Sequence, residues 1–367
     1  MSIGWPWTRK GSSDQLVVSW FGQTLSYVIA RLQANGSHEV IKFGVVRQGA
    51  DSTEDFVRRL RALGLNGYKT RIMLLPDQYQ FMQVDAPAVA PDEMRAAARY
   101  QIRTMVDVPV DDLSIDVMRV GDGRQKGAGQ LYVIAATNAV VRDVLDLGEV
   151  MNWTVSVIDI QETAQRNLQN ALAARDGQAD GANAALVLVD GQKTLLTISA
   201  NQELFYTRRF ELPEGFLTAP WRYESDVPGG LTESITTFKP VDEYVPDYSM
   251  DGVSYRTDYT EAQPVLRKPV SDGDRNDEKA QLFVLEVQRS LDVWTRSWSS
   301  MPLSALRVYA GERSTELSKW LGVQLGQTLM PMDVTTLFSG FESEAEDSKS
   351  MCSLLLGVLM RTDSRKL

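Results

Sequence analysis

The chain has 367 residues and a formal net charge of −10, and 43% of its residues are apolar. This length and apolar content are typical of a globular protein with more than one domain. The negative charge, without a stripe of clustered Lys and Arg, argues against nucleic-acid binding, because phosphate recognition depends on such clusters. The single cysteine, Cys352, excludes an intramolecular disulfide and fits a reducing compartment, so we expect a cytoplasmic protein.

The sequence predicts neither a membrane span nor a secretory signal. It has no run of about 18 apolar residues, and its first residues lack the apolar centre of a signal peptide. Residues 1–14 contain Trp5, Trp7, Arg9 and Lys10, a composition that suits contact with a bilayer interface. Because so few residues anchor weakly, we favour a frayed tail over membrane contact.

Two hairpins with glycine in the turn each open one half of the chain. The first joins predicted strands at residues 15–20 and 25–30, and the second joins predicted strands at residues 184–189 and 194–199. Gly22 lies in the first turn. The repetition suggests a duplicated fold that holds a nucleotide between two such turns.

The first hairpin is followed by elements typical of a mixed α/β layer. We expect a strand at residues 40–46, then a helix that begins with the capping pair Ser52 and Asp55, then a strand at residues 70–75. Together with the hairpin, these residues form a predicted first subdomain, 15–76, with a ribonuclease H-like crossover.

Residues 77–158 are predicted to form an inserted subdomain. Its expected elements are a strand at 80–84, a helix from Pro91, strands at 113–120 and 131–136, a helix capped by Asn138 and a strand at 155–160. The remainder, residues 159–367, is the predicted second domain.

Residues 211–279 lack any helical or strand period, and such a long irregular stretch in a compact domain is functional or mobile. Its tyrosines favour an extended segment packed on the second domain over a plain linker. These tyrosines are Tyr244, Tyr248, Tyr255 and Tyr259. We expect regular structure to return in a helix whose apolar stripe packs into the hydrophobic core. The stripe contains Phe283, Val287, Leu291, Trp294 and Trp298.

Several collinear segments resemble the type IV pilus assembly protein PilM and its relatives. Residues 286–294, EVQRSLDVW, are similar to the E-I-x-R-S-L-[DE]-[YF] helix of that family. Residues 91–109 resemble its P-x-x-E helix that ends in F-P, and residues 355–361 resemble its terminal A-x-G-L-A-L-R helix. Matches to its D-Y, V-A-A-P and V-D-V-E-P-x-A signatures fall between them, at Asp116, 135–136 and 158–164.

The resemblance implies an α/β protein with the actin-like ATPase fold: two ribonuclease H-like domains and an inserted subdomain of the PilM and FtsA type. Residues 211–279 lie outside the resemblance. Within the family, the altered loops described next favour the MshI-type branch of the mannose-sensitive haemagglutinin pilus.

The first glycine turn lacks the chemistry that the family uses there. PilM-like ATPases have the sequence D-I-G-S-S at this turn, where the aspartate coordinates magnesium and the serines bind phosphate. Here Trp20 stands at the aspartate position, Gln23 and Thr24 replace the serines, and Gly22 persists. Loss of the carboxylate is expected to abolish metal-assisted chemistry.

The other two nucleotide loops are also altered. The family's second turn, D-I-G-A-S-x-T, corresponds to residues 190–194, where Asp190 and Gly191 remain as candidates; the simpler interpretation is a hairpin turn of the Asp-Gly type. Of the adenosine-contacting L-x-G-G motif, Gly311 remains, and it more simply serves a turn after a strand.

We find no alternative catalytic set in the sequence. His38 is the only histidine, and it lies in a predicted loop beside Ser37. Cys352 lies in an apolar helical context, as a buried structural thiol would. Zinc-ligand spacing is absent, so we expect neither a catalytic site nor a metal site.

These observations predict a non-catalytic cytoplasmic scaffold of a type IV pilus assembly platform, peripheral to the inner membrane and without a cofactor. The resemblance implies that it docks the cytoplasmic tail of a PilN-like membrane protein, with the assembly ATPase as a second candidate partner. The alternatives are an ATP-binding PilM-type protein and a GspL-like component of type II secretion.

The inserted subdomain is expected to supply the main partner site. An acidic surface raises the encounter rate with a basic tail and disfavours direct contact with anionic lipid. The candidate residues are Asp85, Asp92, Glu93 and Asp107, although each is more simply a solvated surface carboxylate.

Overall fold

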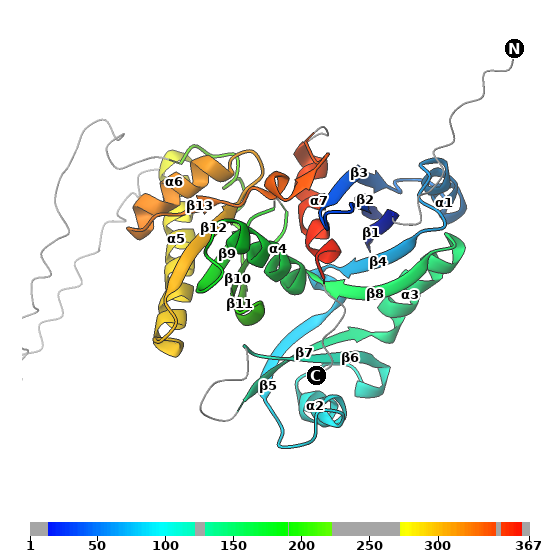
Figure 1. Ribbon diagram of the computed structural model, residues 1–367, viewed down its shortest axis with the longest axis horizontal. Coiled ribbons are helices and arrows are strands. Elements are labelled where there is room, and N and C mark those ends of the chain that lie inside the picture. The colour runs from blue at the N-terminus through cyan, green and yellow to red at the C-terminus, as the bar shows by residue number, and fades with distance from the viewer. Residues whose placement is uncertain (1–13, 122–128, 190, 222–271, 343–345, 362–367) are drawn as a thin grey trace, which may run out of the picture.

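The computed structural model describes residues 14–121, 129–189, 191–221, 272–342 and 346–361. Its strands form three sheets (Figure 1). A six-stranded and a five-stranded sheet make up the two halves of the molecule, and a three-stranded sheet lies below the first half in this view.

The six-stranded sheet has the strand order β14-β3-β2-β1-β4-β8. Its strands are β1 (Asp14–Phe21), β2 (Thr24–Leu32), β3 (His38–Arg47), β4 (Lys69–Leu74), β8 (Thr154–Ile160) and β14 (Phe338–Ser339). The predicted first hairpin is confirmed: β1 and β2 are antiparallel, with Phe21 opposite Thr24 across a two-residue turn. Gly22 has φ 58° in this turn, a conformation that glycine adopts without strain.

The five-stranded sheet has the order β11-β10-β9-β12-β13. Its strands are β9 (Ala182–Val187), β10 (Thr194–Ala200), β11 (Glu203–Phe210), β12 (Leu303–Tyr309) and β13 (Met330–Pro331). Both sheets contain three antiparallel strands, β3-β2-β1 and β11-β10-β9, followed by two parallel ones, β4-β8 and β12-β13. The first sheet also has β14 parallel to β3 at its other edge. The duplication predicted from the two hairpins is therefore present in the topology.

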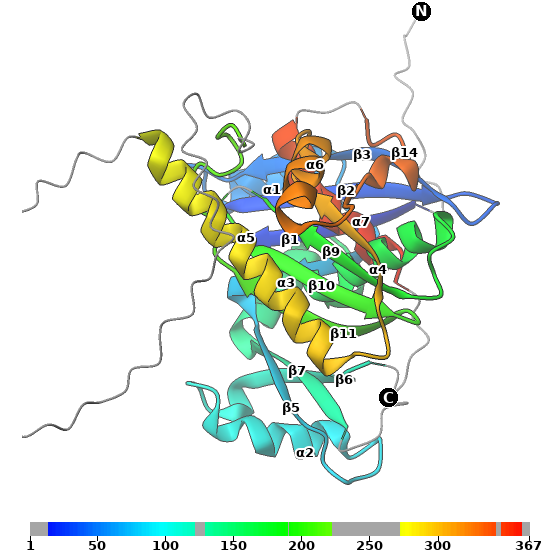
Figure 2. The same cartoon turned by 90° about the vertical axis from the view of Figure 1, so that its left-hand side faces the viewer.

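Helices cover both sheets and fill the space between them. In the first half, α1 (Thr53–Ala62) and α3 (Asn138–Val150) pack on one face of the sheet. The predicted cap of α1 is confirmed, because the Ser52 side chain accepts a hydrogen bond from the Asp55 amide. In the second half, α5 (Asp272–Ser297) and α6 (Ser314–Leu325) cover the outer face, and Figure 2 shows α5 crossing it diagonally.

Two helices, α4 (Gln161–Arg175) and α7 (Glu346–Leu359), lie side by side between the two large sheets (Figure 1). The Asn167 side chain donates a hydrogen bond to the Gly357 carbonyl at 3.0 Å. A Cβ atom at Gly357 would lie 2.0 Å from the carbonyl oxygen of Ala164. Only glycine allows the two helix backbones to approach so closely.

The inserted sheet is smaller than predicted. It has the order β5-β7-β6, with β5 (Gln80–Asp85), β6 (Leu113–Arg119) and β7 (Gln130–Thr137), and α2 (Met94–Gln101) packs on it. The prediction that residues 138–158 belong to this subdomain is wrong, because α3 and β8 complete the first half instead. β8 pairs in parallel with β4, and the apolar side chains Val144 and Leu147 of α3 pack into the core of the six-stranded sheet.

The C-terminal residues also return to the first half, although residues 159–367 were expected in the second domain. β14 pairs with β3, and α7 packs on β1, β2 and β3. The Arg71 guanidinium of β4 donates a hydrogen bond to the Val358 carbonyl at 2.7 Å. Cys352 is buried on this helix, as the sequence predicts.

The predicted irregular segment ends earlier than expected, because α5 already begins at Asp272. The apolar stripe of α5 does pack into the core of the second half, as predicted. Residues 211–221 are irregular and bring Phe216 and Trp221 against Phe283 and Trp320. Residues 222–271, with the four tyrosines named above, lie outside the described residues.

Some local boundaries differ from the predictions. α2 begins at Met94 after a turn rather than at Pro91, and Thr137 rather than Asn138 caps α3. Among the described residues, no helix combines the length and apolarity that crossing a bilayer requires.

Candidate functional site

A chain of polar side chains connects the first glycine turn to the second across the junction of the two halves. Beside the first turn, the Gln78 amide donates a hydrogen bond to the Trp20 carbonyl at 3.0 Å. Tyr79 follows directly in sequence, and its hydroxyl donates to Glu162 Oε2 at 2.5 Å. At the second turn, the Gln161 amide contacts Gln192 Oε1 at 3.4 Å.

Arg209 of β11 lies at the centre of this junction. Its Nη2 lies 2.9 Å from Glu162 Oε1 and 2.9 Å from the Tyr79 hydroxyl oxygen, and its Nη1 donates to Gln161 Oε1 at 2.9 Å. Tyr79 belongs to the segment after β4, and Gln161 and Glu162 open α4. We call Tyr79, Gln161, Glu162 and Arg209 the junction network.

The junction network is largely removed from solvent. The Glu162 side chain is 2% exposed and the Arg209 side chain is 18% exposed. Burial and the neighbouring Glu162 raise the pKa of Tyr79 well above its ordinary value. Burial alone would lower the pKa of Arg209, but Glu162 and Tyr79 outweigh it and the pKa is raised. The phenol is therefore neutral and the guanidinium charged at neutral pH.

Such an arrangement favours one relative placement of the two halves. A buried ion pair loses hydration energy, which its mutual attraction offsets when further hydrogen bonds satisfy the remaining polar atoms. Here the Arg209 guanidinium contacts three partners at once. The protein's own side chains thus link the segment after β4, the start of α4 and β11 across the junction of the two halves.

The predicted nucleotide-binding residues are not brought together by any hydrogen bond or ion pair in the part of the chain that the structure describes. Gly22, Gln23 and Gly191 are exposed in their turns, and Gly191 has φ 70°. Asp190 lies outside the described residues. Within the described ranges, no group of three or more His, Cys, Asp or Glu residues is arranged to hold a metal ion.

Gly311 serves a turn, as the simpler interpretation predicts. It has φ 58° between β12 and α6. The Ser314 hydroxyl accepts a hydrogen bond from the Ala310 amide at 2.9 Å and donates to the Gly311 carbonyl at 2.5 Å. The turn is thereby tied to the first residue of α6.

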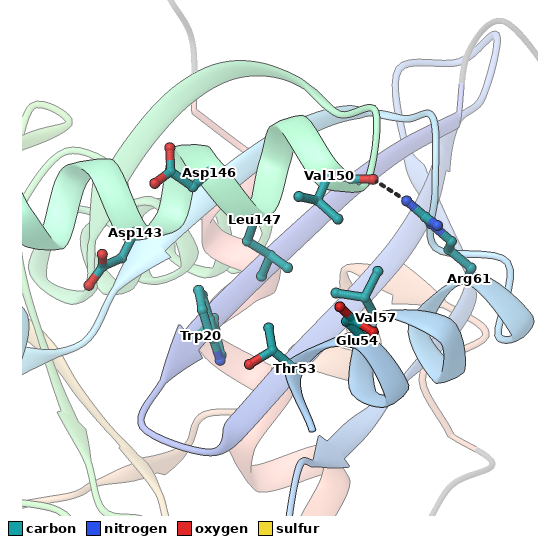
Figure 3. Close-up of a pocket in the computed structure, with 9 residues that line it drawn as sticks. All are labelled: Trp20, Thr53, Glu54, Val57, Arg61, Asp143, Asp146, Leu147 and Val150. Atoms are coloured by element: carbon teal, nitrogen blue, oxygen red, sulfur yellow. Dashed lines mark hydrogen bonds between the residues drawn. The ribbon is translucent and has the colours of Figure 1, made fainter. Parts of the chain in front are cut away.

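Trp20 stands at the expected aspartate position, but its indole does not lie among the junction network. It packs with the core on the side of α1 and α3 and lines a pocket between these helices. The end of β1 therefore presents an indole that packs beside α1 and α3 (Figure 3).

No protein-family model matches the chain, and no curated protein matches it. Among solved structures, a chain of the PilM-PilN type IV pilus biogenesis complex superposes with a TM-score of 0.60 at 16% sequence identity, over 95% of this chain and 98% of that chain. This likeness and the repeated strand order decide the fold. The chain has the actin-like fold.

Two further structures match less well. A Bacteroides thetaiotaomicron protein with an actin-like ATPase fold and unknown function matches over 95% of this chain and 99% of that chain, with a TM-score of 0.44 at 9% identity. The cytoplasmic domain of EpsL, an inner membrane component of the type II secretion system of Vibrio cholerae, matches over 59% and 79%, with a TM-score of 0.38 at 15% identity.

On this actin-like fold, the predicted partner residues Asp85, Asp92, Glu93 and Asp107 all lie exposed on the inserted subdomain. Within the described residues, none of the four carboxylates is paired with a basic side chain. Exposed apolar side chains lie on the same subdomain, on α2 and the segment after it. They are Tyr100, Met105 and Val108.

Sequence reasoning missed the junction network of the actin-like fold. Gln161 and Glu162 do fall within the segment that resembles the V-D-V-E-P-x-A signature, which was a usable signal. Tyr79 and Arg209 carry no local signal, because each is an ordinary residue of its own segment and their contact joins positions 130 residues apart.

Proposed function

We propose that this protein is a non-catalytic scaffold of a type IV pilus assembly platform, of the MshI type, on the cytoplasmic face of the inner membrane. The observation that carries the proposal is the junction network, in which the buried pair of Arg209 and Glu162 joins the two halves. In the first turn, Trp20 stands where the family has its aspartate. The likeness to a chain of the PilM-PilN complex supports the choice of machine.

In this proposal nucleotide binding is negligible and no metal or cofactor takes part. Each lost charge-assisted hydrogen bond to phosphate removes about 1.5 to 3 kcal/mol, and several are missing. Calorimetry of the full chain with Mg-ATP is expected to give no binding heat. A dissociation constant in the low micromolar range would favour an ATP-binding PilM-type protein instead.

The proposed partner is a PilN-like membrane protein whose basic cytoplasmic tail docks on the inserted subdomain. The support is that Asp85, Asp92, Glu93 and Asp107 are exposed and that none of them pairs with a basic side chain among the described residues. The same subdomain has exposed apolar side chains that a juxtamembrane segment can cover. We propose the assembly ATPase as a further partner, reached through the same platform.

The docking proposal is tested by pull-down with the N-terminal tail of the neighbouring PilN-like protein. Reversal of the four carboxylates to lysine is expected to weaken capture. A matched control reverses four exposed carboxylates of the second half, which changes the net charge equally. The control residues are Asp180, Glu278, Asp292 and Glu312. Equal loss in both variants would refute the location, and capture of a type II secretion tail alone would favour the GspL-like alternative.

A further inference from the structure

Helix α5 has exposed apolar side chains on the side that faces away from the core of the second half. Figure 2 shows this helix at the surface of the molecule, in front of the five-stranded sheet. Leu282, Leu285 and Val293 are 56%, 42% and 39% exposed, and none of them belongs to the hydrophobic core of that half. Single exposed apolar residues are common, but three on one side of one helix indicate an interaction surface.

Four residues of α5 form a continuous row, because positions three or four apart lie on the same side of a helix. We call them the outer row, and they are Leu282, Glu286, Arg289 and Val293. Along the helix the row is apolar, acidic, basic and apolar. An antiparallel second copy places each apolar residue opposite an apolar one and each charge opposite its counter-charge. A parallel copy would place like charges together, which is unfavourable.

The two charges of the outer row are already positioned for such a contact. Arg289 Nη1 donates to Glu286 Oε1 at 3.0 Å, and Arg208 of β11 donates to the other oxygen of the same carboxylate. The Glu286 side chain is 29% exposed, whereas that of Arg289 is 59% exposed. A guanidinium has five N–H donors, so Arg289 can contact a second carboxylate without losing the first. In the antiparallel pair, two carboxylates and two guanidinium groups alternate around the two-fold axis.

We propose that the outer row is a homodimer interface, in which the α5 helices of two copies pack antiparallel about a two-fold axis between Val287 and Gln288. Leu282 of one copy packs on Val293 of the other, and Leu285 adds apolar contact at the edge of the row. The row is about 17 Å long at about 1.5 Å per residue, so the interface is small and the dimer weak. It shares no residue with the junction network or with the carboxylates of the inserted subdomain, so it can fail independently of the proposed function.

The first test is sedimentation equilibrium of the full chain at low ionic strength. We expect a monomer–dimer equilibrium with a dissociation constant on the order of 10 to 100 μM. Added salt is expected to weaken the dimer, because it screens the exposed charges of the row. A chain that remains monomeric up to several hundred micromolar would overturn the proposal and leave the outer row to a different protein or to another segment of this chain.

Two variants locate the interface on α5. Leu282→Glu puts a charge into the apolar contact, and Arg289→Glu brings four carboxylates together at the two-fold axis. Each is expected to weaken the dimer by about tenfold or more. Leu145→Glu is the matched control, because Leu145 is a 40% exposed apolar residue of α3 on the first half. An equal effect of the control, or no effect of the two α5 variants, would overturn the proposal.

Cysteine cross-linking tests the antiparallel register. The chain's own Cys352 is buried, so it does not compete for oxidation. A Leu282→Cys chain and a Val293→Cys chain, one of them carrying an affinity tag, are mixed and oxidised, and a mixed disulfide-linked dimer is expected because the two positions face each other.

Each cysteine variant alone is the control for the register. In the antiparallel pair, the two Leu282→Cys positions lie about 17 Å apart along the helices, as do the two Val293→Cys positions. A disulfide needs Cα atoms within roughly 7 Å, so neither variant is expected to cross-link efficiently by itself. Cross-linking of Val293→Cys alone as efficient as that of the mixture would indicate a different arrangement and overturn the proposal.

Discussion

Removing the Arg209 guanidinium is expected to weaken the junction between the two halves severely. Arg209→Ala leaves the Glu162 carboxylate, 2% exposed, without its counter-charge. Removal of one partner from a buried ion pair costs about 3 to 5 kcal/mol, because the other charge remains buried and unpaired. We take the lower end, about 3 kcal/mol, because the Arg209 side chain retains 18% exposure and water can enter in its place.

The assay is urea unfolding at pH 7, followed by tryptophan fluorescence, with Arg209→Ala compared to the unmodified protein. Lys193→Ala is the control, since Lys193 pairs with Glu211 beside the second turn but both side chains are largely exposed. Such exposed pairs contribute about 0 to 1 kcal/mol. The charge-neutral double variant Arg209→Met with Glu162→Gln is expected to recover much of the loss. A loss below about 1 kcal/mol, or a double variant as unstable as the single one, would refute the reasoning.

Three further predictions follow from the same contacts. Gly357→Ala is expected to separate α7 from α4 and to lower the free energy of unfolding by about 2 kcal/mol or more, since its Cβ would lie 2.0 Å from the Ala164 carbonyl oxygen; thermal unfolding checks this, and an unchanged midpoint would contradict it. Because the pKa of Tyr79 is raised in the folded state, its contribution to stability is present below about pH 10 and is lost as the pH rises above it. Urea midpoints between pH 9 and 11 are therefore expected to fall less steeply in Tyr79→Phe, and parallel curves would count against this. Arg209→Ala is expected to leave Mg-ATP binding undetectable by calorimetry, because Trp20 still supplies no carboxylate at the first turn; binding in this variant alone would identify Arg209 as the element that blocks a competent site.

Local sequence patterns predicted those elements whose signals lie within a few residues. The first hairpin follows from two apolar runs around Gly22, and the cap of α1 follows from Ser52 and Asp55. The stripe of α5 follows from helical spacing of its aromatic residues. In each case the turn geometry or the helical period alone specifies the element. The duplicated topology could be predicted because the hairpin pattern occurs twice.

By itself, the sequence determined these elements and the duplication. Only the tertiary structure decided which sheet receives each element. Residues 138–158 and α7 have apolar faces that could pack on either large sheet. The pairing of β8 with β4 and the contacts of α7 with β1, β2 and β3 placed them in the first half. The tertiary structure also decided the direction of Trp20, because β1 is buried on both faces and alternation gives no preference. The junction network depends on Tyr79, Glu162 and Arg209, which meet only after both halves have folded, so no local pattern could reveal it.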